Sequence, residues 1–230
     1  MTGIICAMKL EVDGIIDLME DVKSAEYDSV VFYTGKLGGE EVVAAECGVG
    51  KVNAAISTRM MIDIFKVDRV INSGVAGALS TDVTVGDVVI ATSAVQHDYD
   101  TTALGEPRGM ITLSEGKGIV NFPADEELSQ KLFEAAQKLD NTNVFRGIIA
   151  TGDEFVHAPD RRLAIGEAFS ALACEMEGGA IAHVCYRAKV PYAILRSISD
   201  DLKNNTGMSF DEFKIMAAKK TVDVLSEVLK

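Results

Sequence analysis

The sequence predicts an α/β fold in which helices flank a central mixed β-sheet, within a single domain that spans residues 1–230. Two observations predict it. Short β-rich runs alternate with helical patterns from one end of the chain to the other. Several of those runs are apolar throughout, as in strands that helices cover on both faces. Neither a linker nor an internal repeat divides the chain.

The expected elements follow from these patterns. Strands are expected, in order, at GIICAM, VVFYTGKL, EVVAAECG, VINSGVAG, DVVIATSAV, VFRGIIATGD, ALACEM and YAILRSISD. Helical spacing marks residues 9–23, 51–65, 127–139 and about 209–229, and further helical segments separate the last three strands. Residues 100–122 are expected to be irregular.

The charge balance and the N-terminus exclude several partners. Lys and Arg number 22 against 35 Asp and Glu, so the net charge of −13 offers no cationic surface for a nucleic-acid backbone. The N-terminal segment lacks the pattern of a signal peptide. No apolar run approaches the roughly 20 residues of a membrane-spanning helix. We therefore expect a cytoplasmic protein with neither nucleic-acid nor membrane partners.

Motifs for metal or redox chemistry are missing from the sequence. The four cysteines, Cys6, Cys47, Cys174 and Cys185, lie far apart without CxxC spacing, so we expect buried free thiols. The histidines have no metal-ligand spacing, and His97 is expected in a solvated or subunit-contact loop. We predict no metal and no cofactor.

Acidic residues follow three of the predicted strands. Ligands of α/β sheets bind beyond the carboxyl ends of strands. Glu177 comes just after ALACEM and Asp200 ends YAILRSISD, so both stand at the rim of a core and are expected to contact a ligand. For Asp153 and Glu154 we favour a structural role, as solvated loop residues or helix caps.

Glu11 is a carboxylate on an apolar helix face. It precedes Ile15 by four residues and Leu18 by seven, which places the three side chains on one side of a helix. A buried carboxylate needs either a partner or a chemical role, and the sequence leaves both open.

Three carboxylates around one cleft suit the cleavage of a C–N glycosidic bond. One acid can protonate the departing base, a second can activate water, and a third can hold the ribose hydroxyls. Asp201, beside Asp200, is expected to favour the protonated acid through like-charge repulsion.

On these residues the chain resembles the bacterial 5′-methylthioadenosine/S-adenosylhomocysteine nucleosidases of the nucleoside phosphorylase/hydrolase superfamily. The similar segments run nearly end to end: GIICAMKLEV, ECGVGKVNAA, VINSGVAGAL, ATGDEFV, CEMEGGAIAHVC, VPYAILRSISD and MSFDEF. The resemblance implies a nucleoside phosphorylase/hydrolase-like fold. It also implies hydrolysis of methylthioadenosine and adenosylhomocysteine, with 5′-deoxyadenosine as a further substrate, in methionine salvage.

The resemblance implies roles for individual residues. Glu11 would activate the attacking water, and Asp200 would donate a proton to N7 of adenine. Glu177 would bind ribose hydroxyls. Further contacts with the adenine nucleoside are implied for Met8, Val75, Ala76, Gly77, Phe155, Val156, Glu175, Met176, Arg196, Ser199 and Phe210.

Two positions depart from the family pattern. Val75 stands where relatives often have a serine, so a hydroxyl near the pocket is missing. Leu104 stands near a position where many relatives have a phenylalanine that reaches into the neighbouring subunit. The resemblance implies a homodimer, in which residues 96–104 are the segment expected to contribute to the partner's pocket.

Other functions use related chemistry or motifs. A purine nucleoside phosphorylase or an AMP nucleosidase needs cationic groups for phosphate, which VINSGVAG does not supply. Aminofutalosine hydrolysis stays open. A non-catalytic nucleotide-binding module is suggested only by Gly48-Val49-Gly50, where Asn53 replaces the third glycine of GxGxxG.

Overall fold

The structure of the protein, a computed structural model, describes residues 1–202 and 210–229, except for the side chains of 210–214. Within this part of the chain, ten strands form one mixed sheet. Its strands are β1 (Thr2–Cys6), β2 (Glu20–Tyr27), β3 (Val30–Leu37), β4 (Glu40–Glu46), β5 (Arg69–Ala78), β6 (Val88–Gln96), β9 (Phe122–Pro123), β10 (Val144–Thr151), β11 (Ala171–Glu175) and β12 (Tyr192–Asp200). They run in the order β11-β10-β6-β12-β5-β1-β4-β3-β2, and β9 pairs with β6.

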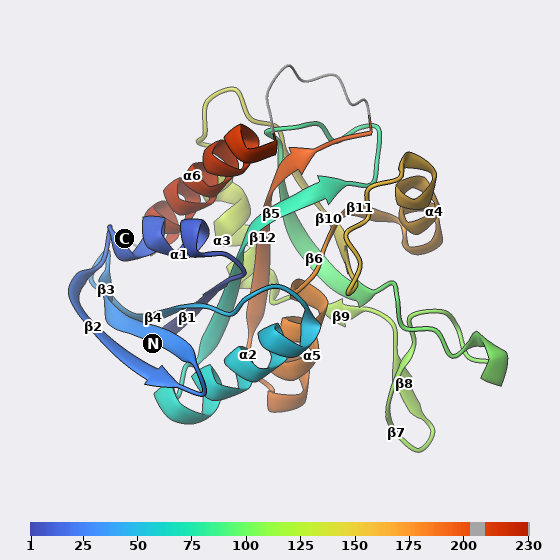
Figure 1. Cartoon of the computed structure of the whole chain (residues 1–230), viewed down its shortest axis with the longest axis horizontal. Helices are drawn as coiled ribbons and strands as arrows, with labels where there is room; N and C mark the ends of the chain where they lie inside the picture. The colour runs from blue at the N-terminus through green and yellow to red at the C-terminus, as the bar shows by residue number, and fades with distance from the viewer. Residues whose placement is uncertain (203–209, 230) are drawn as a thin grey trace.

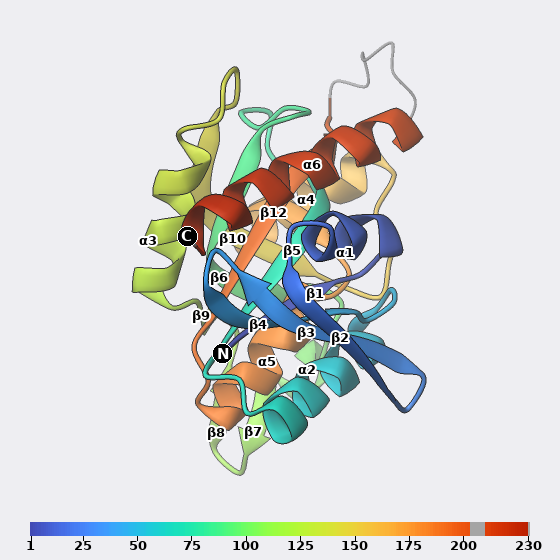
Figure 2. The same ribbon diagram turned by 90° about the vertical axis from the view of Figure 1, so that its left-hand side faces the viewer.

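Helices cover both faces of this sheet (Figures 1 and 2). One layer contains α1 (Lys9–Ile16), α3 (Glu126–Ala136) and α6 (Phe210–Val228), and the other contains α2 (Lys51–Phe65) and α5 (Gly178–Ala188). A sixth helix, α4 (Pro159–Phe169), packs against β10 and β11. Ile4 of β1 belongs to the same core cluster as Leu132 of α3, whereas Ile5 packs with Ile181 of α5. Successive residues of one strand thus face opposite helix layers, as its continuous apolar run predicts.

The expected strands and the mixed α/β fold are confirmed. Each predicted apolar run contributes a strand to the sheet, and the turn between β3 and β4 uses Gly38 and Gly39 at φ of 59° and 89°. The cysteines within the described residues are free and buried, as expected. None of the helices in the described ranges is long and apolar enough to cross a membrane.

The predicted helix over residues 9–23 is wrong beyond Ile16. The chain turns there and residues from Glu20 form β2, whose eight residues are all exposed. Backbone pairing with β3, rather than a buried face, holds this strand, so it has no apolar period for a sequence pattern to reveal. Leu18 consequently lies outside α1 and is 46% exposed, whereas Glu11 and Ile15 are buried as predicted.

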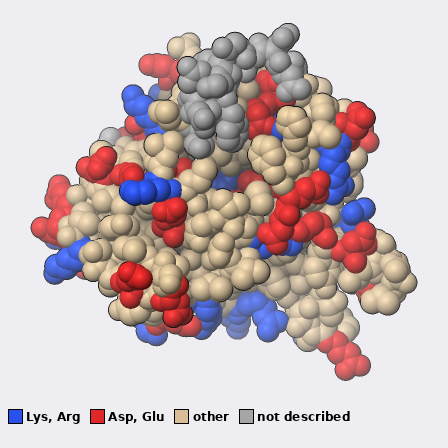
Figure 3. Space-filling model, in the orientation of Figure 1, with Lys and Arg blue, Asp and Glu red and all other residues tan. Residues whose placement is uncertain are grey.

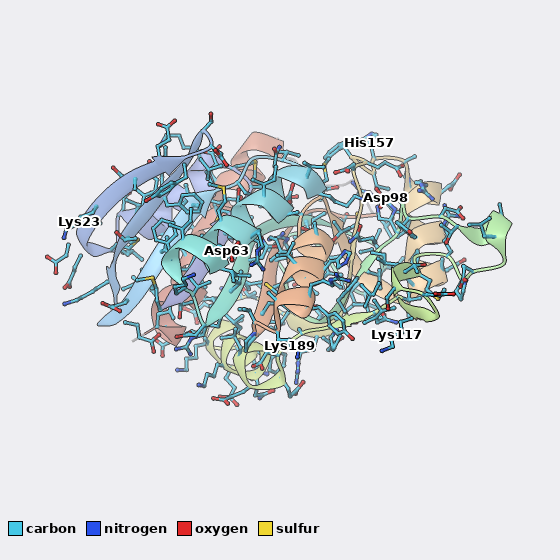
Figure 4. The ribbon with its side chains drawn as sticks, turned by 90° about the horizontal axis from the view of Figure 1, so that it is seen from below. Lys23, Asp63, Asp98, Lys117, His157 and Lys189 are labelled. Carbon is cyan, nitrogen blue, oxygen red and sulfur yellow. The ribbon has the colours of Figure 1, made fainter. Side chains whose placement is uncertain are left out.

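The stretch expected to be irregular contains short ordered pieces. A 3-10 turn spans Thr102–Leu104, and β7 (Ile111–Ser114) pairs with β8 (Lys117–Ile119) in a separate hairpin. These strands are too short to show a period-two pattern. Lys117 of the hairpin and Lys23 of β2 lie in opposite halves of the molecule (Figure 4).

Three strands end at one point of the sheet. Gly77 of β5 pairs with Asp200 of the parallel strand β12 and with Cys174 of the antiparallel strand β11. The residues that follow β11 and end β12 therefore meet beside β5, at the edge where polar residues were expected.

Candidate active site

A cavity of about 250 Å³ opens where these strand ends meet. Every residue predicted for the site lines the cavity except Phe210, whose side chain lies outside the described residues. The fold thus brings Glu11, Glu177 and Asp200, which are far apart in the sequence, around one space.

A buried arginine connects the acids at one end of the cavity. Arg196 of β12 is 2% exposed, and its Nη2 donates to Glu175 Oε2 and Asn72 Oδ1, each at 2.5 Å. The same nitrogen lies 4.0 Å from Glu177 Oε2. Glu175 Oε2 also accepts the backbone amide of Glu177 at 3.0 Å, while its Oε1 accepts the Thr151 hydroxyl. Glu175, predicted as a substrate contact, therefore has both oxygens engaged by donors of the protein and fixes the start of α5.

Glu11 is held by backbone amides rather than by a side-chain partner. Its Oε2 accepts the amides of Ala7 and Met8 at 3.1 and 3.0 Å, and its Oε1 accepts that of Val75 at 3.1 Å. Burial raises the pKa of this carboxyl, while the charge of Arg196 and the three amides oppose the rise. The Val75 backbone thus positions Glu11, although its side chain lacks the hydroxyl that relatives often have there.

Gly74 makes room for the charged groups around Glu11. A Cβ atom at this position would lie 2.8 Å from Glu11 Oε1 and 2.9 Å from Arg196 Nη1. Other contacts hold the Glu11 carboxylate and the Arg196 guanidinium in place, so a side chain at residue 74 would displace one of them. The first glycine of VINSGVAG, Gly74, therefore serves close packing at the acid cluster.

Glu177 lies between Arg196 and the start of α2. Its Oε1 accepts the backbone amide of Gly50 at 2.9 Å. Burial, together with the neighbouring charge of Glu175, raises the pKa of Glu177 to about 7, although Arg196 and the Gly50 amide favour its ionised form. The carboxyl is thus poised between its two protonation states near neutral pH.

Asp200 stands at the opposite end of the cavity, on β12. Its Oδ1 accepts the Ser199 hydroxyl at 2.8 Å, and its Oδ2 accepts Nη2 of Arg162, a residue of α4. Asp201 directs its own Oδ2 to the backbone amide of Val85, at 3.2 Å. The Asp200 carboxylate therefore contacts a cation that the sequence did not suggest, and the like-charge effect expected of Asp201 stays a prediction.

Comparison with known proteins identifies the family. The family model of the phosphorylase superfamily matches residues 2–230. The 5′-methylthioadenosine/S-adenosylhomocysteine nucleosidase of Staphylococcus haemolyticus is 39% identical over 231 residues, which cover 100% of this chain and 99% of that protein. The chain belongs to this nucleosidase family.

Solved structures of the nucleosidase family share the fold. The Neisseria meningitidis nucleosidase, in complex with methylthio-immucillin-A, has a TM-score of 0.91 at 37% identity, with 100% of this chain and 98% of that chain covered. The futalosine hydrolase of Helicobacter pylori strain 26695 has a TM-score of 0.90 at 35% identity, with 99% and 96% covered. The resemblance expected from the motifs is therefore confirmed over the whole chain.

In this nucleosidase-family chain, the backbone amides at the start of α2 donate to carboxylates of the chain, whereas in a phosphate-binding protein such amides would donate to the phosphate. The glycine motif precedes α2, and the amide of Gly50 donates to Glu177 while that of Lys51 donates to Asp153 Oδ1 at 2.8 Å. The structural role favoured for Asp153 is thereby confirmed. Glu154, at the cavity rim, forms an ion pair with Arg161 at 2.9 Å.

Sequence reasoning missed some residues that line the cavity. The cavity is also lined by Ala7, Val49, Gly74, Glu154, Arg162 and Cys174. Arg162 could have been found by the argument used for Glu11, because it precedes the buried Ile165 by three residues and so shares its helix face.

A solvated position for His97, one of the two alternatives expected, is wrong, whereas the subunit contact expected of its loop stays a prediction. Its side chain is 1% exposed and packs against Gly152, rather than lying in solvent. Burial lowers the pKa of this imidazole, although the neighbouring Asp98 opposes the shift.

The raised pKa of Glu177 makes the stability of the protein depend on pH. The folded chain keeps this proton up to about pH 7, whereas the unfolded chain releases it near 4.5. The folded state binds more protons in that interval, so the free energy of unfolding contributed by Glu177 falls as pH rises. In Glu177→Gln, whose side chain stays neutral, this contribution to the free energy of unfolding should no longer decrease as pH rises. The decrease removed is on the order of 2–3 kcal/mol.

Urea unfolding at pH 5 and pH 8, without ligand, measures the difference. Glu127→Gln is the matched control, because the exposed Glu127 has its pKa held below the usual value by Lys131 and is ionised at both pH values. A Glu177→Gln variant with the wild-type difference between the two pH values would contradict the assignment.

Proposed function

We propose that the protein hydrolyses the N-glycosidic bond of 5′-methylthioadenosine and S-adenosylhomocysteine, releasing adenine with methylthioribose or S-ribosylhomocysteine. The observation that carries the proposal is the placement of Glu11, Glu177 and Asp200 around one cavity in a chain of the nucleosidase family. The proposal extends to 5′-deoxyadenosine as a further substrate, and to a cytoplasmic role in methionine salvage.

At the base end of the cavity, Asp200 protonates N7 of adenine as the C–N bond breaks. Ser199, which donates to Asp200 Oδ1, orients the acid. Phe155 is 65% exposed and lines the cavity, and its ring is proposed to stack on the purine. The backbone of Val156, on the same loop, reads the edge of the base, and Gly77 and Ala76 lie along it.

At the sugar end, Glu11 takes the proton of the attacking water. The three amides that hold its carboxylate aim it into the cavity. Glu177 accepts hydrogen bonds from the ribose hydroxyls, and Met8 and Met176 pack against the sugar. The negative charge of these carboxylates stabilises the positive charge that develops on the ribose in an oxocarbenium-like transition state. Phe210 is proposed to cover the 5′ substituent.

A second candidate substrate is aminofutalosine. A solved structure of a futalosine hydrolase is about as similar to this chain as those of the nucleosidases. The chemistry at the glycosidic bond is the same for both substrates, so the group at the 5′ position decides between them.

Adenine release from methylthioadenosine, by purified protein with and without phosphate, tests the proposed reaction. We expect release that phosphate does not change, with methylthioribose as the other product. Strict dependence on phosphate would assign the protein to phosphorolysis instead. Release from aminofutalosine but not from methylthioadenosine would favour the second candidate.

Asp200→Asn and Glu11→Gln should each lower kcat by about 100-fold or more, because each removes one proton transfer of the reaction. The substitutions are nearly isosteric, so binding of methylthio-immucillin-A should remain measurable by calorimetry. Asp140→Asn, at an exposed position, serves as the control. A variant of Asp200 or Glu11 with near wild-type kcat would show that its assigned role is wrong.

We also propose that the protein is a homodimer, formed through an exposed apolar face of α2 and the preceding loop. Val49, Val52, Ile56 and Ile64 follow one another at helical spacing and are 52%, 67%, 46% and 40% exposed. Figure 3 shows a broad area of uncharged side chains over this part of the molecule. Leu104 is 81% exposed in the segment expected to reach the partner's pocket. Apolar surface of this extent favours burial against another subunit.

Sedimentation velocity checks the dimer. The wild type should sediment as a dimer, and Val52→Glu with Ile56→Glu should dissociate it, because two buried unpaired charges would be created. Val22→Glu, at a 41% exposed position of β2, should remain dimeric. A wild-type monomer with full specific activity would refute the proposal.

A further inference from the structure

Arg162 is a buried cation at the end of the cavity opposite Arg196. It lies on α4 and is 4% exposed. Its Nη2 donates to Asp200 Oδ2, its Nε donates to the carbonyl oxygen of Val156 at 2.9 Å, and its Nη1 donates to that of Asp201 at 3.3 Å. One guanidinium therefore joins the two segments that hold the purine in the proposed function, namely the loop before α4 and the end of β12.

The surrounding chain is built to admit this contact. A Cβ atom at Gly77 would lie 3.1 Å from Asp200 Oδ2 and 3.5 Å from Arg162 Cζ, so the glycine leaves room for the ion pair. A Cβ atom at Gly166 would lie 2.6 Å from the carbonyl oxygen of Leu79, so this glycine lets α4 approach the segment that follows β5 closely. Two glycines on separate elements thus permit the arginine to reach the aspartate.

We infer that Arg162 is a positioning residue for the departure of the purine, which acts by stabilising the Asp200 carboxylate as it forms. The inference rests on the proposed function. In the step concerned, the O–H bond of protonated Asp200 breaks and an N7–H bond forms. The electron pair of the C–N glycosidic bond passes to the purine, which leaves as neutral adenine.

The charge balance of this step explains why a cation belongs beside the acid. In the protein without substrate, Asp200 is a carboxylate paired with Arg162. In the proposed substrate complex it carries the proton for N7, so it begins the step neutral and ends it again as a carboxylate next to a fixed guanidinium. Their attraction is small before the proton moves and grows as it leaves. An interaction that strengthens toward the transition state raises kcat rather than substrate affinity. Within a site removed from water, the attraction between the Asp200 carboxylate and the Arg162 guanidinium is also weakly screened.

A structural arginine would behave differently. If Arg162 only tied the Val156 loop to β12, its loss would disorder the base site and would impair every substrate that binds there. If it acts through Asp200, its loss matters only where the leaving group needs a proton. A substrate whose leaving group departs as a stable anion therefore separates the two roles.

The experiment compares Arg162→Met with wild type on two substrates. With methylthioadenosine, kcat should fall roughly 10- to 100-fold, a part of what general acid catalysis contributes, while KM changes less than about 3-fold. With 4-nitrophenyl 5-methylthioriboside, whose nitrophenolate leaves without a proton, kcat should stay within about 2-fold. The matched control is Arg161→Met, which removes the neighbouring arginine and its ion pair with Glu154, and should keep wild-type kcat on both substrates.

A second variant covers a possible failure of Arg162→Met to fold. Arg162→Lys keeps the charge but cannot make three directed bonds, so it should give an intermediate kcat on methylthioadenosine, with thermal unfolding that still begins above the assay temperature. Equal losses on both substrates, or a loss confined to KM, would overturn the inference and leave a structural role. Full activity of Arg162→Met would overturn it too. Failure of the wild type to release adenine would instead refute the proposed function itself, before any variant is compared.

Discussion

The buried charge of Arg196 is the constraint on which the candidate active site depends. A guanidinium that is 2% exposed needs partners, because an unpaired ion in the interior costs several kcal/mol. Its partners come from β5, β11 and the start of α5, so one side chain fixes three elements relative to one another. Glu11, Glu175 and Glu177 share this one cation, so its charge only partly offsets the cost of burying three carboxylates. The pKa values of Glu11 and Glu177 are therefore raised.

The starts of two helices complete this arrangement and exclude a competing ligand. Free amides at a helix start, together with the helix dipole, attract anions such as phosphate. Here the amides at the start of α2 donate to the carboxylates of Glu177 and Asp153, and an amide at the start of α5 donates to that of Glu175. The acids of the site thus serve as the anions of these helices, which favours water over phosphate as the nucleophile.

Sequence patterns found the elements that bury their own side chains and missed those that do not. Strands such as GIICAM and YAILRSISD were predicted because both of their faces are covered. The strand β2 was missed because backbone pairing with β3 holds it while all its side chains are exposed. Glu11 was found because a carboxylate interrupts an apolar helix face, and the same irregularity at Arg162 was available in α4 but passed unnoticed.

The sequence by itself determined the α/β class, the acids at strand ends and the family, because these depend on local periodicity and on motifs within single segments. Only the tertiary structure decided the partners of the acids. The sequence suggested only the adjacent Asp201 as a charge beside Asp200, and the fold adds Arg162, which contacts the Asp200 carboxylate directly. The reason is geometric. A side chain in a folded sheet is surrounded by residues of other elements, and strand pairing and helix packing, rather than distance along the chain, choose which charges meet.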